Sequence, residues 1–202
     1  MANKDDEQIL VVKSDILFRD GKWQGLKTEN LDYYIDLINK NCEFKRRGDM
    51  ENNPSFKQII PYILFSFKNN FFAYKYLGGA GEKRLVDVYQ LGVGGHINPG
   101  DGKEGDVLEV GMMREWDEEV DFKGRILEKK LVGIINSDAG SVERVHLGLV
   151  YNFIGDGPDI SIKENDKMAG KLVEPQNIWQ YIKGNPSIWT QIIYKDYLSK
   201  LI

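Results

Sequence analysis

Three glutamates at helical spacing are the residues of this 202-residue chain whose types and positions most directly suggest chemistry. Glu115, Glu118 and Glu119 lie in residues 106–120, a run of good helix formers with apolar residues spaced for one face. At about 100° per residue, the three carboxylates fall within an arc of roughly 100°. Carboxylates this close repel one another unless a cation lies among them, and their oxygens suit Mg²⁺ or Mn²⁺. A solvated acidic face is the alternative interpretation of the same spacing.

The same predicted helix carries an apolar stripe beside the acids. Leu108, Met112, Trp116 and Val120 cluster on this stripe and are expected to face the core. Gly111 projects into the middle of the carboxylate arc, where glycine costs about 1 kcal/mol in helix propensity relative to alanine. A residue without a side chain would leave room over the acids, so the sequence predicts open space above the acidic face.

The residues around the glutamates resemble a known motif. Residues 114–122, Arg-Glu-Trp-Asp-Glu-Glu-Val-Asp-Phe, are similar to the core of the Nudix box, G-x5-E-x7-R-E-U-x-E-E-x-G-U, in which U is a bulky apolar residue. The arginine, the first glutamate, Trp116, the glutamate pair and Phe122 all fall in register. A glycine-rich loop over residues 94–102 precedes the helix, as the family requires. The chain therefore resembles Nudix hydrolases.

This resemblance implies roles for individual residues. Glu115, Glu118 and Glu119 would hold Mg²⁺ or Mn²⁺, with the backbone carbonyl of Gly94 as a further ligand. Arg114 would pair with a carboxylate of the box and hold it in position. The implied activity is the metal-dependent hydrolysis of a diphosphate linkage in a small nucleoside-diphosphate-linked molecule. Divalent ions suit this reaction because they neutralise phosphoryl charge and activate water.

Two positions depart from the family's pattern. Asp121 stands where the box has its closing glycine, so the exit from the helix must be made differently. An aspartate also replaces the first glutamate of the box, and two registers compete for this position. Counting back from the helix arginine gives Asp106, whereas counting forward from the glycine pair at residues 94–95 gives Asp101. We favour Asp101, because the glycine pair then follows a strand where the family places it.

Other polar residues are candidates for supporting roles. The base that activates water varies within the family, and Glu119 could serve as base as well as metal ligand. The loop acids Glu143, Glu164 and Asp166 are alternatives. His96 is close enough to the box to contact phosphate, although a structural hydrogen bond is the simpler interpretation. Structural or solvated roles are also the simpler interpretation for the other histidine and for several basic residues: His146, Arg46, Arg47, Lys75, Lys83 and Arg84.

Strand-like and helical patterns alternate along the chain. Strands are expected over residues 8–17, from residue 23, and over 59–67, 71–77, 84–93, 130–135 and 145–153, with a hairpin connection at 68–70. Helices are expected from residue 31 to about 42, over 106–120 and in parts of the last forty residues, whereas 44–55 is predicted to be a loop. Together these elements predict an α/β (α+β) fold of the Nudix type, with a mixed β-sheet sandwiched between helices. We expect a strand and helix extension over residues 1–57 and a Nudix hydrolase domain over residues 58–202.

Two other functions fit parts of the sequence. Isopentenyl-diphosphate isomerase shares the Nudix fold and uses a cysteine, but no matching motif surrounds the lone Cys42. The second alternative is a Nudix-fold module that binds a nucleotide or regulates without catalysis. The altered box positions favour such a module, and the presence of all three glutamates argues against it.

The composition excludes several classes of partner. With 27 Lys+Arg and 31 Asp+Glu, the formal net charge is −4, which gives no electrostatic footprint for nucleic acid or anionic membranes. The longest strongly apolar stretch, residues 59–67, is far shorter than the roughly 20 residues of a spanning helix. A single cysteine allows no intrachain disulfide and fits a reducing compartment. We therefore expect a cytoplasmic protein with a small-molecule diphosphate substrate, and a homodimer is left open.

Overall fold

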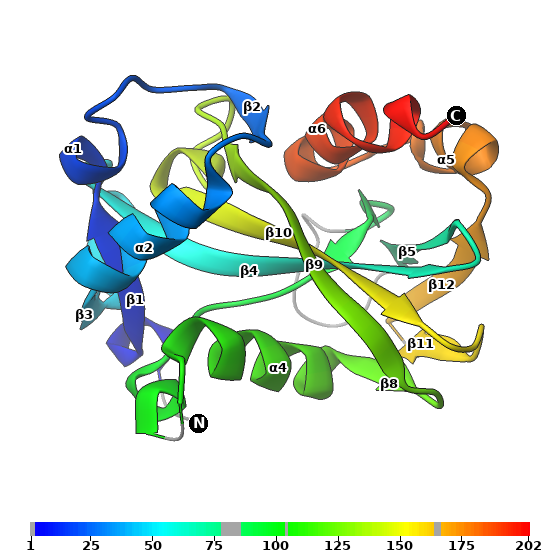
Figure 1. The fold of residues 1–202 in the computed structure, drawn as a ribbon, viewed down its shortest axis with the longest axis horizontal. Helices are drawn as coiled ribbons and strands as arrows, with labels where there is room; N and C mark the ends of the chain where they lie inside the picture. The colour runs from blue at the N-terminus through cyan, green and yellow to red at the C-terminus, as the bar shows by residue number, and fades with distance from the viewer. Residues whose placement is uncertain (1–2, 78–85, 104, 164–166) are drawn as a thin grey trace. The chain divides into compact units, whose positions relative to one another are not determined.

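The computed structural model describes residues 3–77, 86–103, 105–163 and 167–202 of the chain (Figure 1). These residues divide into two compact units. The first consists of residues 1–62, 95–114 and 131–150, and the second of residues 63–94, 115–130 and 151–202. Several elements contribute residues to both units: β4 (Phe56–Phe67), α4 (Val107–Glu119), β9 (Ile126–Asn136) and β10 (His146–Gly155). Each unit combines helices with β-sheet, so the predicted α+β class is confirmed.

In the first unit the strand order is β3-β1-β4-β10-β9-β2. β1 (Gln8–Lys13) pairs antiparallel with β3 (Glu43–Arg46) and with β4, and β2 (Gly25–Lys27) pairs antiparallel with β9. Helix α2 (Leu31–Asn41) lies alongside β1 (Figure 1), and its buried side chains recur at the spacing of one helix face. The unit also contains the short helices η1 (Lys4–Asp6), α1 (Ser14–Leu17), α3 (Arg47–Met50), η3 (Pro99–Lys103) and η4 (Glu143–Val145).

In the second unit β5 (Asn70–Tyr76) pairs with β4 and, on its other side, with β12 (Met168–Val173). The short strands β6 (Tyr89–Gln90) and β7 (Gly92–Val93) pair with β5 and β4 respectively. A separate two-stranded sheet joins β8 (Val120–Phe122) to β11 (Ile160–Ile162). The carboxyl-terminal helices of this unit are α5 (Pro175–Ile182), α6 (Ile188–Asp196) and η5 (Leu198–Lys200).

The predicted hairpin between β4 and β5 is confirmed. Lys68 and Asn69 form a two-residue connection, and both have left-handed backbone angles, with φ of 46° and 64°. A two-residue loop with two positive φ values matches the twist of the strands that it joins. The register that follows places Phe67 opposite Asn70.

Two expectations for the first unit are wrong. The strand expected over residues 8–17 ends at Lys13, where the backbone N–H and the hydroxyl of Ser14 donate to the carbonyl oxygens of Ser55 and Pro54, each at 2.8 Å, and α1 begins. Residues 44–55 are not a loop, because they include most of β3 and all of α3. Several of the charged residues that favoured a loop are engaged in ion pairs, both with one another and with residues near the amino terminus.

Those ion pairs account for the basic residues of this segment. Arg46 pairs with Asp6 at 2.8 Å and with Asp49 at 3.1 Å. The next residue, Arg47, pairs with Glu7 and Glu51, each at 3.0 Å. Neither guanidinium is therefore merely solvated. Instead they join the amino-terminal residues to β3 and α3.

The expected strand over residues 84–93 is largely wrong. Residues 84 and 85 lie outside the described residues, and strand occurs only at the short β6 and β7 within the rest. Asp87 has a φ of 60°, which interrupts an extended backbone before β6 begins. In the described ranges, no helix combines the length and hydropathy that a membrane span requires.

Candidate functional site

The helix α4 begins where Asp106 caps it. The side-chain Oδ1 of Asp106 accepts hydrogen bonds from the backbone N–H of Leu108, at 2.8 Å, and of Glu109, at 3.2 Å. An aspartate in this place satisfies backbone donors that have no partner within the helix. The predicted helix is confirmed, and its apolar stripe is buried as expected: Leu108, Met112, Trp116 and Val120.

A buried ion pair joins the glycine-rich loop to the helix. Arg114 donates from Nε to Oδ1 of Asp101 at 2.9 Å and from Nη2 to Oδ2 at 3.0 Å, a two-pronged arrangement. The same Nη2 donates to the backbone carbonyl of His96 at 2.7 Å, and the backbone N–H of Asn98 donates to Asp101 at 2.8 Å. Of the two aspartates that compete for the first acidic position, Asp101 therefore pairs with the arginine and Asp106 caps the helix.

The electrostatics of this ion pair keep Asp101 ionised. Asp101 is only 4% exposed, and burial alone would raise the pKa of its carboxyl group. The hydrogen bonds from Arg114 and from the backbone of Asn98, together with the charge of Arg114, outweigh burial and hold the pKa below its ordinary value. The ion pair is consequently intact at neutral pH.

The space beside Gly111 is filled, so the prediction of open room above the acids is wrong at this position. A Cβ atom built on Gly111 would lie 2.9 Å from Cγ1 of Ile97 and 3.0 Å from Oδ2 of Asp101. Ile97 is fully buried, and its carbonyl accepts a hydrogen bond from the backbone of Leu10 at 2.8 Å. Glycine is present because the loop carrying the ion pair packs directly against the helix.

Replacing Gly111 with alanine should therefore destabilise the protein, by up to about 2 kcal/mol. Alanine gains about 1 kcal/mol in helix propensity, but overpacking a tight contact costs roughly 1–3 kcal/mol, and both neighbours here are fixed by other contacts. Urea unfolding would measure the change. Gly100→Ala is the matched control, because a Cβ there meets nothing within 4 Å. Higher stability for Gly111→Ala would show that the loop can yield.

The three glutamates lie on the last two turns of α4, in the second unit. Glu115 is 8% exposed, Glu119 is half-buried and Glu118 is exposed. Gly94, the proposed backbone ligand, follows β7 directly in the same unit. Among the described residues, no three His, Cys, Asp or Glu side chains are grouped closely enough to hold a metal ion. The donor chemistry nevertheless fits Mg²⁺ or Mn²⁺, because residues three and four apart share a helix face and all their ligand atoms are oxygens.

Strand β8 follows α4 without an intervening loop, and Lys163 contacts the last turn of the helix. The chain passes straight from Glu119 into β8, where Asp121 lies opposite Ser161 of β11. Lys163 follows β11, and its backbone N–H donates to the carbonyl of Glu119 at 2.8 Å. Its side-chain ammonium donates to the carbonyl of Asp117. These contacts surround the helix exit, where an aspartate stands at the position of the box glycine.

The two histidines form a hydrogen-bonded pair in the first unit. Nδ1 of His146 lies 2.6 Å from the carbonyl of Val142, so Nδ1 is the donor and Nε2 is left as an acceptor. Nε2 of His96 lies 2.7 Å from Oε1 of Gln58 and 3.4 Å from Nε2 of His146, and the shared proton is therefore on His96. Burial above all, and nearby positive charges, lower the pKa of His96 to about 3. Both rings are neutral at pH 7 and have structural contacts.

The remaining sequence candidates lie elsewhere in the chain. Glu143 is at the start of η4 and is partly exposed. Lys75 forms an ion pair with Asp87 at 3.3 Å. Cys42 lies at the end of α2, where burial raises the pKa of its thiol and so disfavours the reactive thiolate. The other candidates lie outside the described residues: Lys83, Arg84, Glu164 and Asp166.

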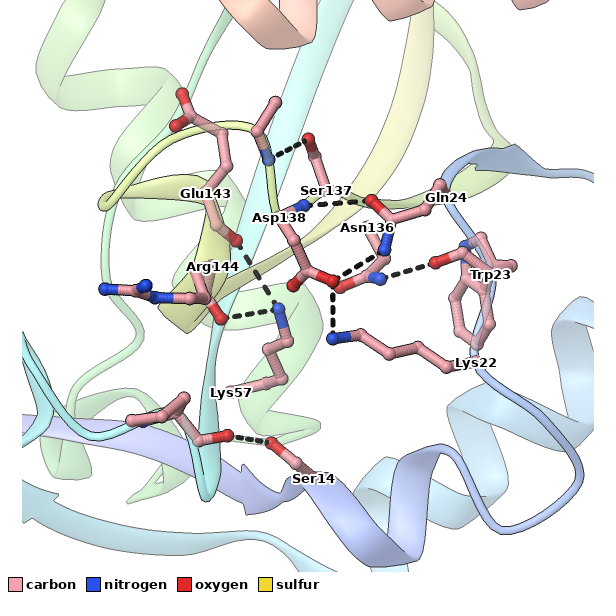
Figure 2. Close-up of polar contacts among 12 residues, drawn as sticks. Ser14, Lys22, Trp23, Gln24, Lys57, Asn136, Ser137, Asp138, Glu143 and Arg144 are labelled. Atoms are coloured by element: carbon pink, nitrogen blue, oxygen red, sulfur yellow. Dashed lines mark hydrogen bonds and ion pairs between the residues drawn. The ribbon is translucent and has the colours of Figure 1, made fainter.

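Sequence reasoning missed a buried lysine. Lys57 is 1% exposed, and its ammonium donates to the backbone carbonyls of Glu143 at 3.4 Å and Arg144 at 2.7 Å (Figure 2). It also donates to the backbone carbonyl of His146 at 3.3 Å. Burial lowers the pKa of Lys57 to about 8, against the nearby charge of Asp138, which raises it. Lys57 lies between Phe56 and the polar Gln58 at the start of β4, so no local pattern indicated its burial.

Asp138 and its neighbours fix the other end of the same loop, residues 137–145. Its carboxylate accepts from Lys22 at 2.6 Å and from the amide of Gln24 at 2.7 Å, and its backbone N–H donates back to Gln24 at 2.9 Å (Figure 2). Asn136, just before the loop, donates to the carbonyl of Trp23 at 2.6 Å. Residues 22–24 and Lys57 thus hold both ends of this loop.

Known proteins resemble this chain along nearly its whole length, although no family model matches it. Protein YmaB of Bacillus subtilis (strain 168) is 32% identical over 201 residues, covering 94% of this chain and 97% of YmaB. The structure of Tm1382, a candidate Nudix hydrolase, is 28% identical and superposes with a TM-score of 0.82 over 96% of this chain and 100% of that one. A bifunctional NMN adenylyltransferase/ADP ribose pyrophosphatase from Francisella tularensis, solved with AMP and a Mn ion, shares the fold, with 15% identity and a TM-score of 0.50 over 71% of this chain and 42% of its own. Helix α4 carries the residues of the box, and Arg114 of the box is paired with Asp101. Together with these likenesses, this shows that the chain belongs to the Nudix family.

Proposed function

We propose that this Nudix protein is a divalent-metal-dependent hydrolase that cleaves a diphosphate linkage in a small nucleoside-diphosphate-linked molecule. The observation that carries the proposal is the helix α4. Its last two turns bear Glu115, Glu118 and Glu119, and the residue before them, Arg114, is fixed by the buried Asp101. Such a helix presents acidic ligands from a rigid element, which is what a catalytic metal site requires.

In this proposal the glutamates bind the metal, and Gly94 contributes its backbone carbonyl. A bound Mg²⁺ or Mn²⁺ neutralises charge on the phosphoryl oxygens and makes water a better nucleophile at neutral pH. Glu115, as the most buried of the three acids, supplies the ligand least accessible to solvent. Glu119, which shares a helix face with the other two acids, is the proposed acceptor of a proton from water. Glu143, Glu164 and Asp166 are the alternative bases. Arg114 acts on the arrangement of the loop and the helix and does not touch the substrate.

The likeness to Tm1382 supports this proposal at the level of the whole chain, because that protein is itself a candidate Nudix hydrolase. The Francisella tularensis enzyme, whose structure holds AMP and a manganese ion, is similar at the level of the fold alone. Neither likeness identifies the substrate. Specificity depends on loops around the acids, which differ within one fold.

Metal dependence is the first test. The purified protein should release phosphate or nucleotide from at least one member of a panel of nucleotide sugars, dinucleoside polyphosphates, nucleoside triphosphates and ADP-ribose when Mg²⁺ or Mn²⁺ is present. A chelator should reduce turnover to background, and excess Mg²⁺ should restore it. The release of products would be measured by chromatography, with binding of each compound followed by thermal shift. Ligand-induced stabilisation without any turnover would contradict hydrolysis and favour a nucleotide-binding module.

A further inference from the structure

The last turn of α4 is electrostatically unfavourable on its own. Asp117, Glu118 and Glu119 are adjacent there, and the carboxyl end of a helix carries partial negative charge from its unpaired carbonyl groups. Three acids near that end add repulsion to the dipole. Two of the three are proposed metal ligands, so the geometry of this turn affects metal binding directly.

Lys163 contacts this turn twice. Its backbone N–H donates to the carbonyl of Glu119 at 2.8 Å, and its ammonium donates to the carbonyl of Asp117. The backbone contact continues the ladder between β11 and β8, which pairs Ile162 with Val120, by one residue into the helix. The backbone and the ammonium of Lys163 therefore each donate a hydrogen bond to a carbonyl near the carboxyl end of α4.

From these contacts we propose that Lys163 is a positioning residue for metal binding, which holds the turn carrying Glu118 and Glu119 in the way that a closing glycine would hold it. This inference rests on the proposed function. Asp121, in the glycine position, lies in a β-ladder and pairs with Lys123 at 2.6 Å, so it does not make the helix exit itself. The ammonium of Lys163 places a positive charge on the carbonyl of Asp117, within the last turn of the helix.

Lys163→Met should weaken Mn²⁺ binding by about two- to fivefold, the range expected for an exposed charge at a helix terminus. Lys163→Arg, which keeps a positive donor, should bind nearly as well as the wild type. Lys123→Met is the matched control, because it removes the same charge from a lysine that pairs with Asp121 and not with α4. Restoring the family glycine in Lys163→Met/Asp121→Gly should recover part of the loss. Mn²⁺ affinity would be measured by electron paramagnetic resonance, without substrate.

Kinetics would add an independent comparison. Lys163→Met should raise the Mg²⁺ concentration needed for half-maximal turnover while leaving KM for the substrate at saturating Mg²⁺ close to wild type. Equal Mn²⁺ affinities for Lys163→Met and Lys123→Met, with a wild type that binds Mn²⁺, would overturn the inference and leave the proposed function standing. A wild type that binds no Mn²⁺ would overturn both. Circular dichroism would confirm folding, and Lys163→Gln makes the same comparison if the methionine variant is unfolded.

Discussion

Glu118→Gln is expected to reduce kcat/KM by about two to three orders of magnitude, the size of effect produced by removing one group that stabilises transition-state charge. Glutamine keeps the shape of the side chain and removes the charge that binds metal. Because Glu118 is exposed on α4, the substitution should leave the unfolding free energy within about 0.5 kcal/mol of wild type. Loss of activity without loss of stability would separate a chemical role from a structural one.

Asp117→Asn is the control for this variant. It removes the same charge from the neighbouring residue, whose side chain points about 100° away around the helix from that of Glu118. Asp117 is also exposed. Full turnover and unchanged Mg²⁺ dependence in Glu118→Gln would contradict the assignment of this glutamate as a metal ligand. A comparable loss in Asp117→Asn would show that only the total charge of the helix matters.

Arg114→Met is expected to destabilise the protein by about 3 kcal/mol. The substitution leaves the buried carboxylate of Asp101 without its charged partner, and breaking one side of a buried pair costs roughly 3–5 kcal/mol. The lower end applies because the side chain of Arg114 is 27% exposed. Urea unfolding at neutral pH would measure this loss. A loss below about 1 kcal/mol would mean that water replaces the guanidinium.

The pH dependence of that loss provides its control. In the wild type the pKa of Asp101 lies below its ordinary value, so the stability from the pair is fully present above the pKa of an unfolded aspartate and disappears as the pH falls through the folded value. In Arg114→Met, burial instead favours the protonated acid, so the difference between the two proteins should shrink as the pH falls. Arg114→Met/Asp101→Asn should be more stable than Arg114→Met, because no charge is then left unpaired.

The acid-bearing helix was predictable because its pattern is local. Periodicity located α4 and its buried stripe, including Leu108 and Trp116, and the box assigned roles to its glutamates. Which aspartate takes the first acidic position of the box was ambiguous, because both Asp101 and Asp106 precede the helix in a loop, where spacing does not determine the contact. Gly111 was misinterpreted for a related reason. Its neighbours, Ile97 and Asp101, come from outside the helix and cannot be inferred from helical spacing.

The other differences also concern contacts between distant residues. Residues 44–55 resemble a loop because they are polar and charged, but Arg46 and Arg47 find partners near the amino terminus, and a strand and a helix form. The short strands β8, β11 and β12 were not predicted either, since three to six residues carry too little alternation to be distinguished from loop. Lys57 was overlooked because it precedes the apolar run that begins at Ile59, and its three carbonyl acceptors come from residues 143–146, far away in the sequence.

The hydrogen bonds from Lys57 to the carbonyls of Glu143, Arg144 and His146 have a practical consequence for protein engineering. Lys57, Gln24 and Trp23 all hydrogen-bond to the segment from Ile134 to His146, and together they form one network in the first unit. In a chimera with a relative, exchanging only the part that contains Lys57 would place a different side chain beside the carbonyl groups of Arg144 and His146. Exchanging only the loop would leave the buried ammonium of Lys57 among carbonyl groups that are not placed to accept its hydrogen bonds. We expect hybrids to fold only when both pieces are taken from the same parent.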